Sequence, residues 1–367
     1  MEHRAEARID LAAIAANISA LKNASGVDLL AVVKADAYGH GLIEIGLASE
    51  KNGADWLGVA LLEEAIALRT HGVRIPILAW LVPPGSDFRA ALNHDIDVAI
   101  SSIAAFKEIS RLRGKPRIHI EVDTGMTRGG FLDEWSEFLR SDFSHVETVG
   151  VFSHFARADE PAELQNNIQL NRFKEMVNDL AQVGVNPPIK HLSNSAATLK
   201  NHGAAFDLVR TGIAMYGLSP DVEALGSSKE LGLKPAMQLR AKLHLVKKVP
   251  AGSPVGYGAM AVTATETNLG IVAMGYADGI PRNAQGAGVF VDGARAPIIG
   301  RVSMDQFVVD LGAQSTAKSG DWAIVFGDGR HGEYTADDWG AASSSINYEI
   351  VTRIGPRVSR IYAPHVY

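Results

Sequence analysis

The 367-residue sequence contains no cysteine. This absence excludes disulfides, thiolate metal sites, iron–sulfur clusters and cysteine nucleophiles. The sequence also lacks an apolar run of the roughly 18 residues that a membrane-spanning helix requires. Its first residues, MEHRAEARID, are charged where a secretory signal has an apolar stretch. We therefore expect a cytoplasmic protein that has no membrane partner.

Positive charge is not in excess either. The chain has 35 Lys and Arg against 41 Asp and Glu, a net charge of −6, which leaves no basic face to neutralise phosphates and argues against a nucleic-acid partner. The 12 histidines are scattered and form no H-E-x-x-H pattern, so we expect no metal site. A hydrophobic fraction of 47% is ample for one large folded domain or two.

The first part of the chain alternates between short apolar runs and segments with helical spacing. Eight runs are predicted to be strands: Leu29–Val33, Trp56–Ala60, Pro76–Trp80, Asp97–Ile100, Arg117–Asp123, Glu147–Ser153, Ile189–Ser193 and Leu208–Arg210. Most are apolar at consecutive positions, as in strands that are covered on both faces. Repeated strand–helix units imply a parallel sheet, and eight of them favour a (β/α)8 TIM-type barrel over an open sheet.

After about Leu233 the pattern changes. Strand-like runs broken by Gly, Asp and Pro turns follow each other too closely for crossover helices, so we expect a mostly antiparallel β domain. We place the barrel domain at residues 1–232 and the β domain at residues 233–367, with a linker near Leu225–Lys234.

Residues 327–332, GDGRHG, fit the dinucleotide-binding pattern G-x-G-x-x-G. No strand–helix–strand unit surrounds them and the next residues, EYTADDWG, are polar. We interpret the segment as a hairpin turn rather than a nucleotide site.

Catalytic side chains of a barrel gather at the carboxyl ends of its strands. Polar residues end five of the predicted strands: Lys34; Asp123 and Arg128; Ser153 and His154; Ser193, Asn194 and Ser195; Arg210 and Gly212. Ser195 and the Gly212–Ile213 amides follow strands seven and eight, where barrels commonly bind phosphate. A lysine opposite a phosphate cradle suits pyridoxal phosphate, whose aldehyde reacts with an amine. Each residue alone could be an ordinary surface or core residue, but their convergence indicates an active site.

Nine motifs occur in order over nearly the whole chain: AVVKADAYGHG, DTGMTRGG, HFARADE, NSAAT, VRTGIAMYG, GYG, GYADGIPR, GRVSMDQ and NYEIVTRIGPRV. Together they resemble the alanine racemases, pyridoxal-phosphate-dependent isomerases of the barrel type. The resemblance implies a barrel followed by a β domain into which the first residues, around Ala5–Asp10, pair. It also implies interconversion of L- and D-alanine through an external aldimine, a supply of D-alanine for peptidoglycan, and a homodimer whose sites use both chains.

The resemblance assigns roles position by position. Lys34 would hold the cofactor as an internal aldimine and act on the α-proton of D-alanine, and Tyr257, from the partner subunit, would act on that of L-alanine. The cofactor-binding set would be Lys34, Tyr38, His154, Asn194, Ser195, Arg210, Gly212, Ile213 and Tyr348. Arg128 and Met304 would bind the substrate, and Asp159, Tyr276, Arg282 and Arg301 would line the corridor that leads to the site.

The chemistry accounts for these residue types. Racemisation removes the α-proton from one face and returns a proton to the other, so two acid–base groups must flank the carbon. A tyrosine has a pKa near 10, which must be lowered or its proton passed on. Arg210 would face the pyridine nitrogen; an arginine can hydrogen-bond that nitrogen without protonating it, which disfavours a long-lived carbanion.

One position departs from the family. Glu121 lies two residues before the Asp of DTGM, where the family often has a lysine modified to a carbamate. We hypothesise that Glu121 supplies the negative charge near Arg128 directly.

Three alternatives compete with an alanine racemase. A racemase of broader specificity, acting on serine, lysine or arginine, would share these motifs. A barrel-type decarboxylase of basic amino acids would have a cysteine at the site, and this chain has none. A cofactor-carrying barrel without catalytic turnover would lack the second domain, so the GYG and GRVSMD motifs count against it.

Overall fold

The computed structural model describes residues 3–200 and 202–364. These residues divide into two compact units. The barrel unit comprises residues 14–37, 42–200 and 202–233, and the β unit comprises residues 3–13, 38–41 and 234–364.

The barrel unit is built on parallel strands in the sheet order β8-β7-β6-β5-β4-β3-β2-β9. Their bounds are β2 (Asp28–Val32), β3 (Trp56–Val59), β4 (Ile77–Ala79), β5 (Ile96–Ile100), β6 (Arg117–Glu121), β7 (Glu147–Phe152), β8 (Ile189–His191) and β9 (Leu208–Thr211). The last strand, β9, pairs with the first, β2. Between β8 and β9 the Arg210 amide donates to the Ser193 carbonyl at 2.9 Å. The prediction of an eight-stranded parallel barrel is confirmed for the described residues.

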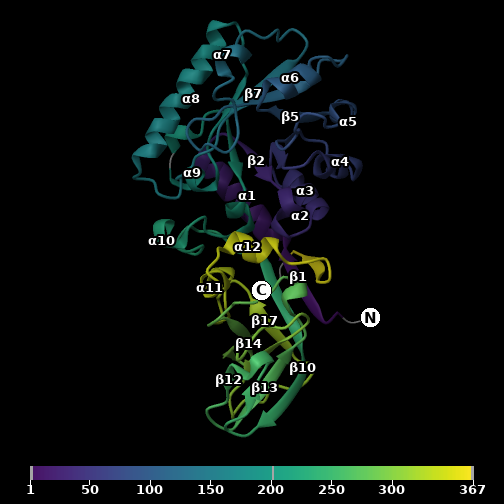
Figure 1. The fold of residues 1–367 in the computed structure, drawn as a ribbon, viewed down its shortest axis with the longest axis vertical. Coiled ribbons are helices and arrows are strands. Elements are labelled where there is room, and N and C mark those ends of the chain that lie inside the picture. Colours follow the sequence, from purple (N-terminus) through teal and green to yellow (C-terminus); the bar gives the residue numbers. More distant parts are fainter. Residues whose placement is uncertain (1–2, 201, 365–367) are drawn as a thin grey trace. The chain divides into compact units, whose positions relative to one another are not determined.

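Helices surround these strands (Figure 1). They are α1 (Leu11–Ser25), α3 (Leu42–Lys51), α4 (Leu62–Thr70), α5 (Phe88–Asn93), α6 (Ile103–Ile109), α7 (Trp135–Phe138), α8 (Leu164–Gln182), α9 (Ser195–Lys200) and α10 (Val222–Leu225), with short 3-10 turns at η1 (His202–Ala204) and η2 (Ile213–Tyr216). Side-chain caps set where some of them begin. The Asp87 carboxylate accepts from the Ala90 amide at 2.8 Å, and the Ser102 hydroxyl accepts from the Ala105 amide at 3.3 Å.

The strands are buried because helices cover one face and the barrel interior the other. Leu57, Ile77 and Ile100 have no exposed surface. In β3, a Cβ atom on Gly58 would overlap the side chains of Leu30 and Trp80. The consecutive apolar runs in the sequence therefore reflect burial on both faces.

The β unit is organised around the long strand β10 (Met237–Val249). It pairs antiparallel with β1 (Ala5–Asp10), β13 (Thr267–Val272) and β17 (Trp322–Phe326), and β1 also pairs in parallel with β18 (Ser359–Ala363). The other elements are β11 (Pro254–Val255), η3 (Tyr257–Ala259), β12 (Ala261–Val262), η4 (Tyr276–Asp278), β14 (Gly288–Val291), β15 (Ala294–Pro297), β16 (Phe307–Asp310), α11 (Ala336–Ala342) and α12 (Asn347–Thr352). The prediction of a mostly antiparallel second region is confirmed.

The hairpin predicted at residues 327–332 is wrong. This segment leads from β17 into helix α11, because Thr335 caps that helix: its hydroxyl accepts from the Asp338 amide at 3.1 Å, and its own amide donates to the Asp338 carboxylate at 2.9 Å. Strand β17 pairs antiparallel with its neighbours, so the glycines do not belong to a parallel nucleotide-binding unit.

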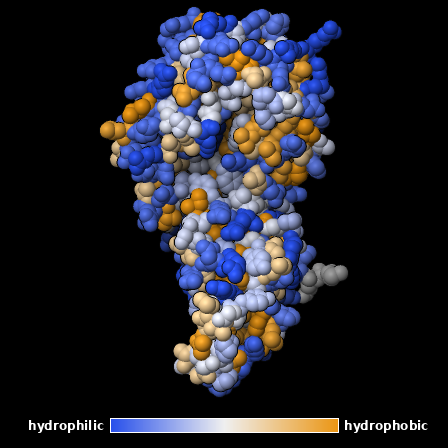
Figure 2. Space-filling view, viewed as in Figure 1, coloured by the Kyte–Doolittle hydropathy of each residue, from blue (hydrophilic) through white to orange (hydrophobic). Residues whose placement is uncertain are grey.

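Hydrophilic residues cover most of the visible surface, and apolar residues are scattered among them (Figure 2). None of the helices in the described ranges is long and apolar enough to span a membrane.

Candidate active site

The polar ends of the barrel strands lie at one rim. Because all strands of the barrel run in the same direction, the segments after β2, β6, β7, β8 and β9 gather at their carboxyl ends. The predicted residues there are Lys34, Arg128, His154, Asn194, Ser195, Arg210, Gly212 and Ile213. Two of the loops are joined directly, because Thr124 Oγ1 and Ser153 Oγ are 2.8 Å apart. The barrel unit thus brings these residues together.

Lys34 follows β2 and opens an unusual turn, α2 (Lys34–Tyr38). Ala35, Asp36 and Ala37 have φ values of 54°, 53° and 52°, in the left-handed region. L-residues adopt this conformation at a cost of roughly 1–2 kcal/mol each. Such conformations persist where surrounding contacts hold them and cluster at functional sites.

Glu64 supplies part of that support, although the sequence did not single it out. Its Oε1 accepts from the Ala35 amide at 2.6 Å, and its Oε2 accepts from the Ala60 and Leu61 amides, each at 3.0 Å. One carboxylate therefore ties the loop after β2 to the loop after β3. The signal in the sequence is an acidic residue in the first turn of the helix that follows a strand.

The environment of Lys34 favours the neutral amine. Burial lowers the pKa of Lys34, the positive charge of Arg128 lowers it further, and the carboxylate of Glu64 partly opposes this. A lysine whose pKa is lowered is a better nucleophile and a better base near neutral pH.

Arg210 is buried at the centre of the rim. Burial lowers its pKa to about 10, Glu121 opposes that shift and Arg128 adds to it, so the guanidinium stays charged at neutral pH. Its Nη2 donates to the Ser153 carbonyl at 2.6 Å, and its Nη1 donates to the His191 carbonyl at 2.9 Å. These bonds fix the plane of the guanidinium.

His154 is neutral at this site. Burial lowers its pKa to about 3, with further contributions from the positive charges of Arg210, Arg128 and Lys34. Its Nδ1 lies 3.3 Å from Arg210 Nη2. Because a guanidinium only donates, Nδ1 is the acceptor and the ring proton resides on Nε2.

Glu121, at the end of β6, faces the two arginines. Burial raises its pKa, and Arg210 and then Arg128 oppose this shift. A Cβ atom on Gly129 would lie 3.2 Å from Glu121 Oε1, so the carboxylate lies next to the backbone of the Arg128 loop. The geometry matches a carboxylate that balances the charge of Arg128.

The Arg128 loop is itself held by Asp123. Its Oδ1 accepts from the amides of Gly125 at 2.8 Å and of Met126 and Thr127, each at 3.1 Å. Asp123 therefore positions the exposed Arg128 side chain rather than adding a free charge to the site.

Ser195 joins the ends of β8 and β9. Its Oγ accepts from the Gly212 amide at 2.9 Å and from the Ala214 amide at 3.4 Å. The Asn194 side chain accepts from the Ala197 amide at 3.0 Å and so caps α9. The Ser195 hydroxyl accepts from these amides and keeps its own proton to donate, at a place where barrels commonly bind phosphate.

Two predicted cofactor residues lie in the β unit. The rings of Tyr38 and Tyr348 have centroids 6.3 Å apart, and burial raises the pKa of Tyr38. A Cβ atom on Gly39 would overlap the Val351 carbonyl, which shows how closely the segment after Tyr38 packs on α12.

Tyr257 and Met304 are exposed on the β unit, at 72% and 53%. Short contacts bring their segments and that of Tyr276 together. A Cβ atom on Gly256 would lie 3.5 Å from the Arg301 amide nitrogen, and the Ala277 amide donates to the Met304 carbonyl at 2.9 Å. The predicted corridor residues Tyr276, Arg282 and Arg301 belong to this unit, whereas Asp159 follows β7 in the barrel unit.

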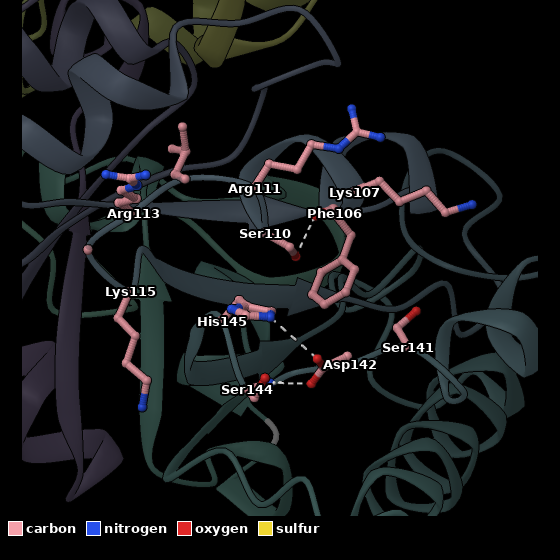
Figure 3. Close-up of a pocket in the computed structure, with 12 residues that line it drawn as sticks. Phe106, Lys107, Ser110, Arg111, Arg113, Lys115, Ser141, Asp142, Ser144 and His145 are labelled. Atoms are coloured by element: carbon pink, nitrogen blue, oxygen red, sulfur yellow. Dashed lines mark hydrogen bonds and ion pairs between the residues drawn. The ribbon is translucent and has the colours of Figure 1, made fainter.

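A cavity of about 770 Å³ lies elsewhere on the barrel unit. It is lined by the loops that precede β6 and β7, at the amino ends of the strands, and contains none of the candidate residues. The side chain of Lys115 extends there in a different direction from those of Lys107 and Arg111 (Figure 3). Barrel enzymes carry their active sites at the opposite rim, at the carboxyl ends of the strands, so this cavity is a poor active-site candidate.

Comparison with known proteins identifies the family. The family model for the alanine racemase N-terminal domain matches residues 9–220, and that for the alanine racemase C-terminal domain matches residues 236–362. The alanine racemase of Thermobifida fusca is 48% identical, with 99% of each chain covered, and that of Salinispora tropica is 46% identical, with 98% of each covered.

Solved structures agree. The crystal structure of alanine racemase from Streptomyces lavendulae has a TM-score of 0.96 at 46% identity and covers 100% of this chain and 98% of its own. That of Bacillus anthracis alanine racemase with bound L-Ala-P has a TM-score of 0.92 at 37% identity and covers 99% of this chain and 96% of its own. As its motifs predict, the chain belongs to the alanine racemase family of isomerases.

Proposed function

We propose that this chain interconverts L- and D-alanine with pyridoxal 5′-phosphate bound at the rim of the barrel. The observation that carries the proposal is the juxtaposition, on one rim, of the Lys34 amine with its lowered pKa and the buried guanidinium of Arg210. The residues fit the cofactor: an amine for the aldehyde, a guanidinium for the ring nitrogen, and for the phosphate the Ser195 hydroxyl, whose oxygen the Gly212 amide holds in place. When bound, the cofactor withdraws electrons from the substrate's α-carbon and acidifies its α-proton.

Several side chains and backbone amides would bind the phosphate of the cofactor. From the barrel unit, Ser195, Gly212 and Ile213 would bind the phosphate, and Asn194 would hold the start of α9 in place. The remaining phosphate contacts would come from Tyr38 and Tyr348, whose rings are neighbours in the β unit. Lys34 would provide the covalent attachment.

Arg210 would hydrogen-bond the ring nitrogen without protonating it. A pKa of about 10 keeps the guanidinium charged at neutral pH, so its protons are not available for transfer. This favours proton return at the same carbon over side reactions.

Lys34 and Tyr257 would be the two bases, one on each face of the α-carbon. The lowered pKa of Lys34 supports proton acceptance near neutral pH. Tyr257 is 72% exposed on its own chain, which supports its use by a partner subunit, where it would be desolvated. The proposed enzyme is therefore a homodimer with shared sites.

His154 would donate a hydrogen bond to the catalytic tyrosine, Tyr257. It is neutral, and its Nε2–H is the proton left to donate once Arg210 occupies Nδ1. A hydrogen bond from Nε2–H to the oxygen of Tyr257 would stabilise the negative charge on that oxygen after the tyrosine has given up its proton.

The substrate carboxylate would bind Arg128, whose loop is held by Asp123 and whose positive charge interacts with Glu121. Met304 would add a backbone amide from the partner subunit. Asp159, Tyr276, Arg282 and Arg301 stay predicted corridor residues. We propose that the D-alanine formed supplies peptidoglycan synthesis; the cytoplasmic location stays a prediction.

A broader racemase remains the main alternative, since serine, lysine or arginine racemases would share the same two bases. The match over both domains favours neither a decarboxylase nor a barrel without turnover. The test is to incubate the purified protein and pyridoxal 5′-phosphate with each L-amino acid and to follow optical rotation, with Lys34→Ala as the control. Loss of rotation with alanine, and much more slowly with the others, is expected; no loss with any amino acid would contradict the proposal.

A further inference from the structure

A column of polar side chains occupies the interior of the barrel, where apolar packing is usual. Asp97 from β5, His119 from β6, His191 from β8 and Arg210 from β9 are 1%, 0%, 0% and 5% exposed. Along β6 the period of two places Arg117, His119 and Glu121 on one face of the strand. Burying four such groups is costly unless each is paired.

The four side chains form an unbroken chain of hydrogen-bond contacts. Arg210 Nη1 lies 3.2 Å from His191 Nδ1, His191 Nε2 lies 2.9 Å from His119 Nδ1, and His119 Nε2 lies 3.2 Å from Asp97 Oδ2. Asp97 is held at the far end by Arg117, whose Nε and Nη2 lie 2.7 and 3.1 Å from its two oxygens. We call Asp97, His119 and His191 the histidine relay.

The two ends of the relay determine where its protons are. Arg210 can only donate, so His191 accepts at Nδ1 and carries its proton on Nε2. That proton is donated to His119 Nδ1, which leaves the proton of His119 on Nε2, facing the carboxylate of Asp97. The opposite arrangement would set an N–H of His191 against an N–H of Arg210, and a lone pair of His119 against the carboxylate. Both ends therefore select the same pair of neutral tautomers.

The surroundings hold both rings in the planes that the relay needs. The ring of Phe152 stacks on His191 at 4.9 Å between centroids, and Trp56 meets His119 edge-on at 5.3 Å. Strand β7 separates β6 from β8 in the sheet. A Cβ atom on Gly150 of β7 would overlap the His119 ring, so this glycine leaves the space through which the relay crosses.

The relay also affects which N–H group of Arg210 has no acceptor among the described residues and can therefore donate to a ligand. The Nη1 protons of Arg210 go to His191 Nδ1 and the His191 carbonyl. Its two Nη2 protons are shared among the Ser153 carbonyl, the Leu192 carbonyl and His154 Nδ1. Within the described part of the chain, Nε–H has no partner. We infer that Asp97 and His119 are positioning residues that fix the His191 tautomer, anchor Nη1 of Arg210, and so reserve Nε–H for the ring nitrogen of the cofactor. This inference rests on the proposed cofactor role of Arg210.

Neutron diffraction from crystals of the protein grown in deuterium oxide tests the relay directly. Deuterons are expected on Nε2 of both His119 and His191, and none on either Nδ1. A deuteron on His191 Nδ1 would overturn the inference. This measurement requires no catalytic activity, so it holds even if the proposed function fails.

Two variants test the consequence for the site. Asp97→Asn offers His119 an amide that can donate as well as accept, and so no longer selects one tautomer. Arg117→Lys is the matched control, because it weakens the ion pair of Asp97 but leaves its carboxylate to accept from His119. Asp97→Asn is expected to lower kcat roughly 10- to 100-fold, the range typical of outer-shell partners, and to shift the absorption maximum of the bound cofactor, with KM for alanine nearly unchanged.

Arg117→Lys is expected to keep the wild-type absorption maximum and a kcat within a few-fold of wild type. Equal losses in both variants, or a wild-type spectrum in Asp97→Asn, would show that Asp97 has only a structural role. If Asp97→Asn does not fold, the neutron map of the wild-type protein still decides.

Discussion

Arg210 Nη2 lies 3.3 Å from Nδ1 of His154, and this contact determines which nitrogen of the imidazole carries the proton. The arginine cannot accept, so His154 presents Nε2–H on its other side. A neutral histidine next to a buried cation is thus a permanent donor in the site rather than a titrating base.

His154 makes the stability of the protein depend on pH. Its pKa is about 3 in the folded chain and near 6.5 when unfolded. Between these values the unfolded chain binds a proton that the folded chain does not, so the free energy of unfolding rises with pH. The stability that comes from keeping His154 neutral is complete above about pH 6.5 and is lost as the pH falls towards 3. Urea unfolding of the cofactor-free protein should show a pH slope in His154→Gln that is shallower by up to about 1.4 kcal/mol per pH unit. The control is His145→Gln, whose side chain is 63% exposed; identical slopes in wild type and His154→Gln would refute the assignment.

Activity should depend on two chains, because Lys34 lies in the barrel unit and the exposed Tyr257 lies in the β unit. Inactive Lys34→Ala and inactive Tyr257→Phe subunits, mixed in equal amounts, should recover about a quarter of wild-type activity: half of the dimers are mixed and each has one intact site of two. Mixing Lys34→Ala with Lys34→Gln should restore nothing. Proven subunit exchange without recovery would mean that each site is built from one chain.

The two bases should act on different enantiomers. Tyr257→Phe removes only the hydroxyl group, so cofactor binding should persist. In deuterium oxide this variant should exchange the α-proton of D-alanine about 10²–10⁴-fold faster than that of L-alanine, the usual cost of losing a general base. Proton NMR measures both rates, with Tyr334→Phe, from the same unit, as the control. Equal exchange from both enantiomers would rule out the two-base mechanism.

Glu121 should matter through its charge. Its carboxylate opposes the positive potential of Arg210 and Arg128, so Glu121→Gln leaves two nearby cations without that anion and disturbs Arg128. We expect KM for alanine to rise about tenfold, the scale of one charged hydrogen bond. The control is Glu137→Gln, an exposed residue 3.7 Å from Lys107. Unchanged KM and kcat in Glu121→Gln would show that the hypothesis is wrong.

Ser195 should set the affinity for the cofactor. Its hydroxyl already lies 2.9 Å from the Gly212 amide, at the place proposed for the phosphate. Ser195→Ala should raise the Kd for pyridoxal 5′-phosphate about 10- to 100-fold, measured by absorbance titration of the cofactor-free protein, while kcat at saturating cofactor changes little. Ser141→Ala, on the opposite rim, is the control. An unchanged Kd would place the phosphate elsewhere.

Much of the architecture could be read along the chain. Runs such as Trp56–Val59 and Ile96–Ile100 are apolar at consecutive positions because they are buried on both faces, and that pattern needs no knowledge of partners. Even the short run that became β9 was recognisable. The ordered motifs, which depend only on local spacing, likewise predicted the family and the residues at the strand ends.

Contacts across the barrel could not be read in this way. His119 and His191 are 72 residues apart and belong to strands that are not neighbours in the sheet, so only closure of the barrel brings them within 2.9 Å. The left-handed turn at Ala35–Ala37 contains no glycine that would indicate it in the sequence. Glu64, whose carboxylate accepts from the Ala35 amide in this turn, is 29 residues from Ala35. Local sequence indicates which segments become strands because the pattern of apolar side chains is carried by consecutive residues. Tautomers, pKa shifts and unusual backbone conformations depend instead on groups that only the tertiary fold brings together.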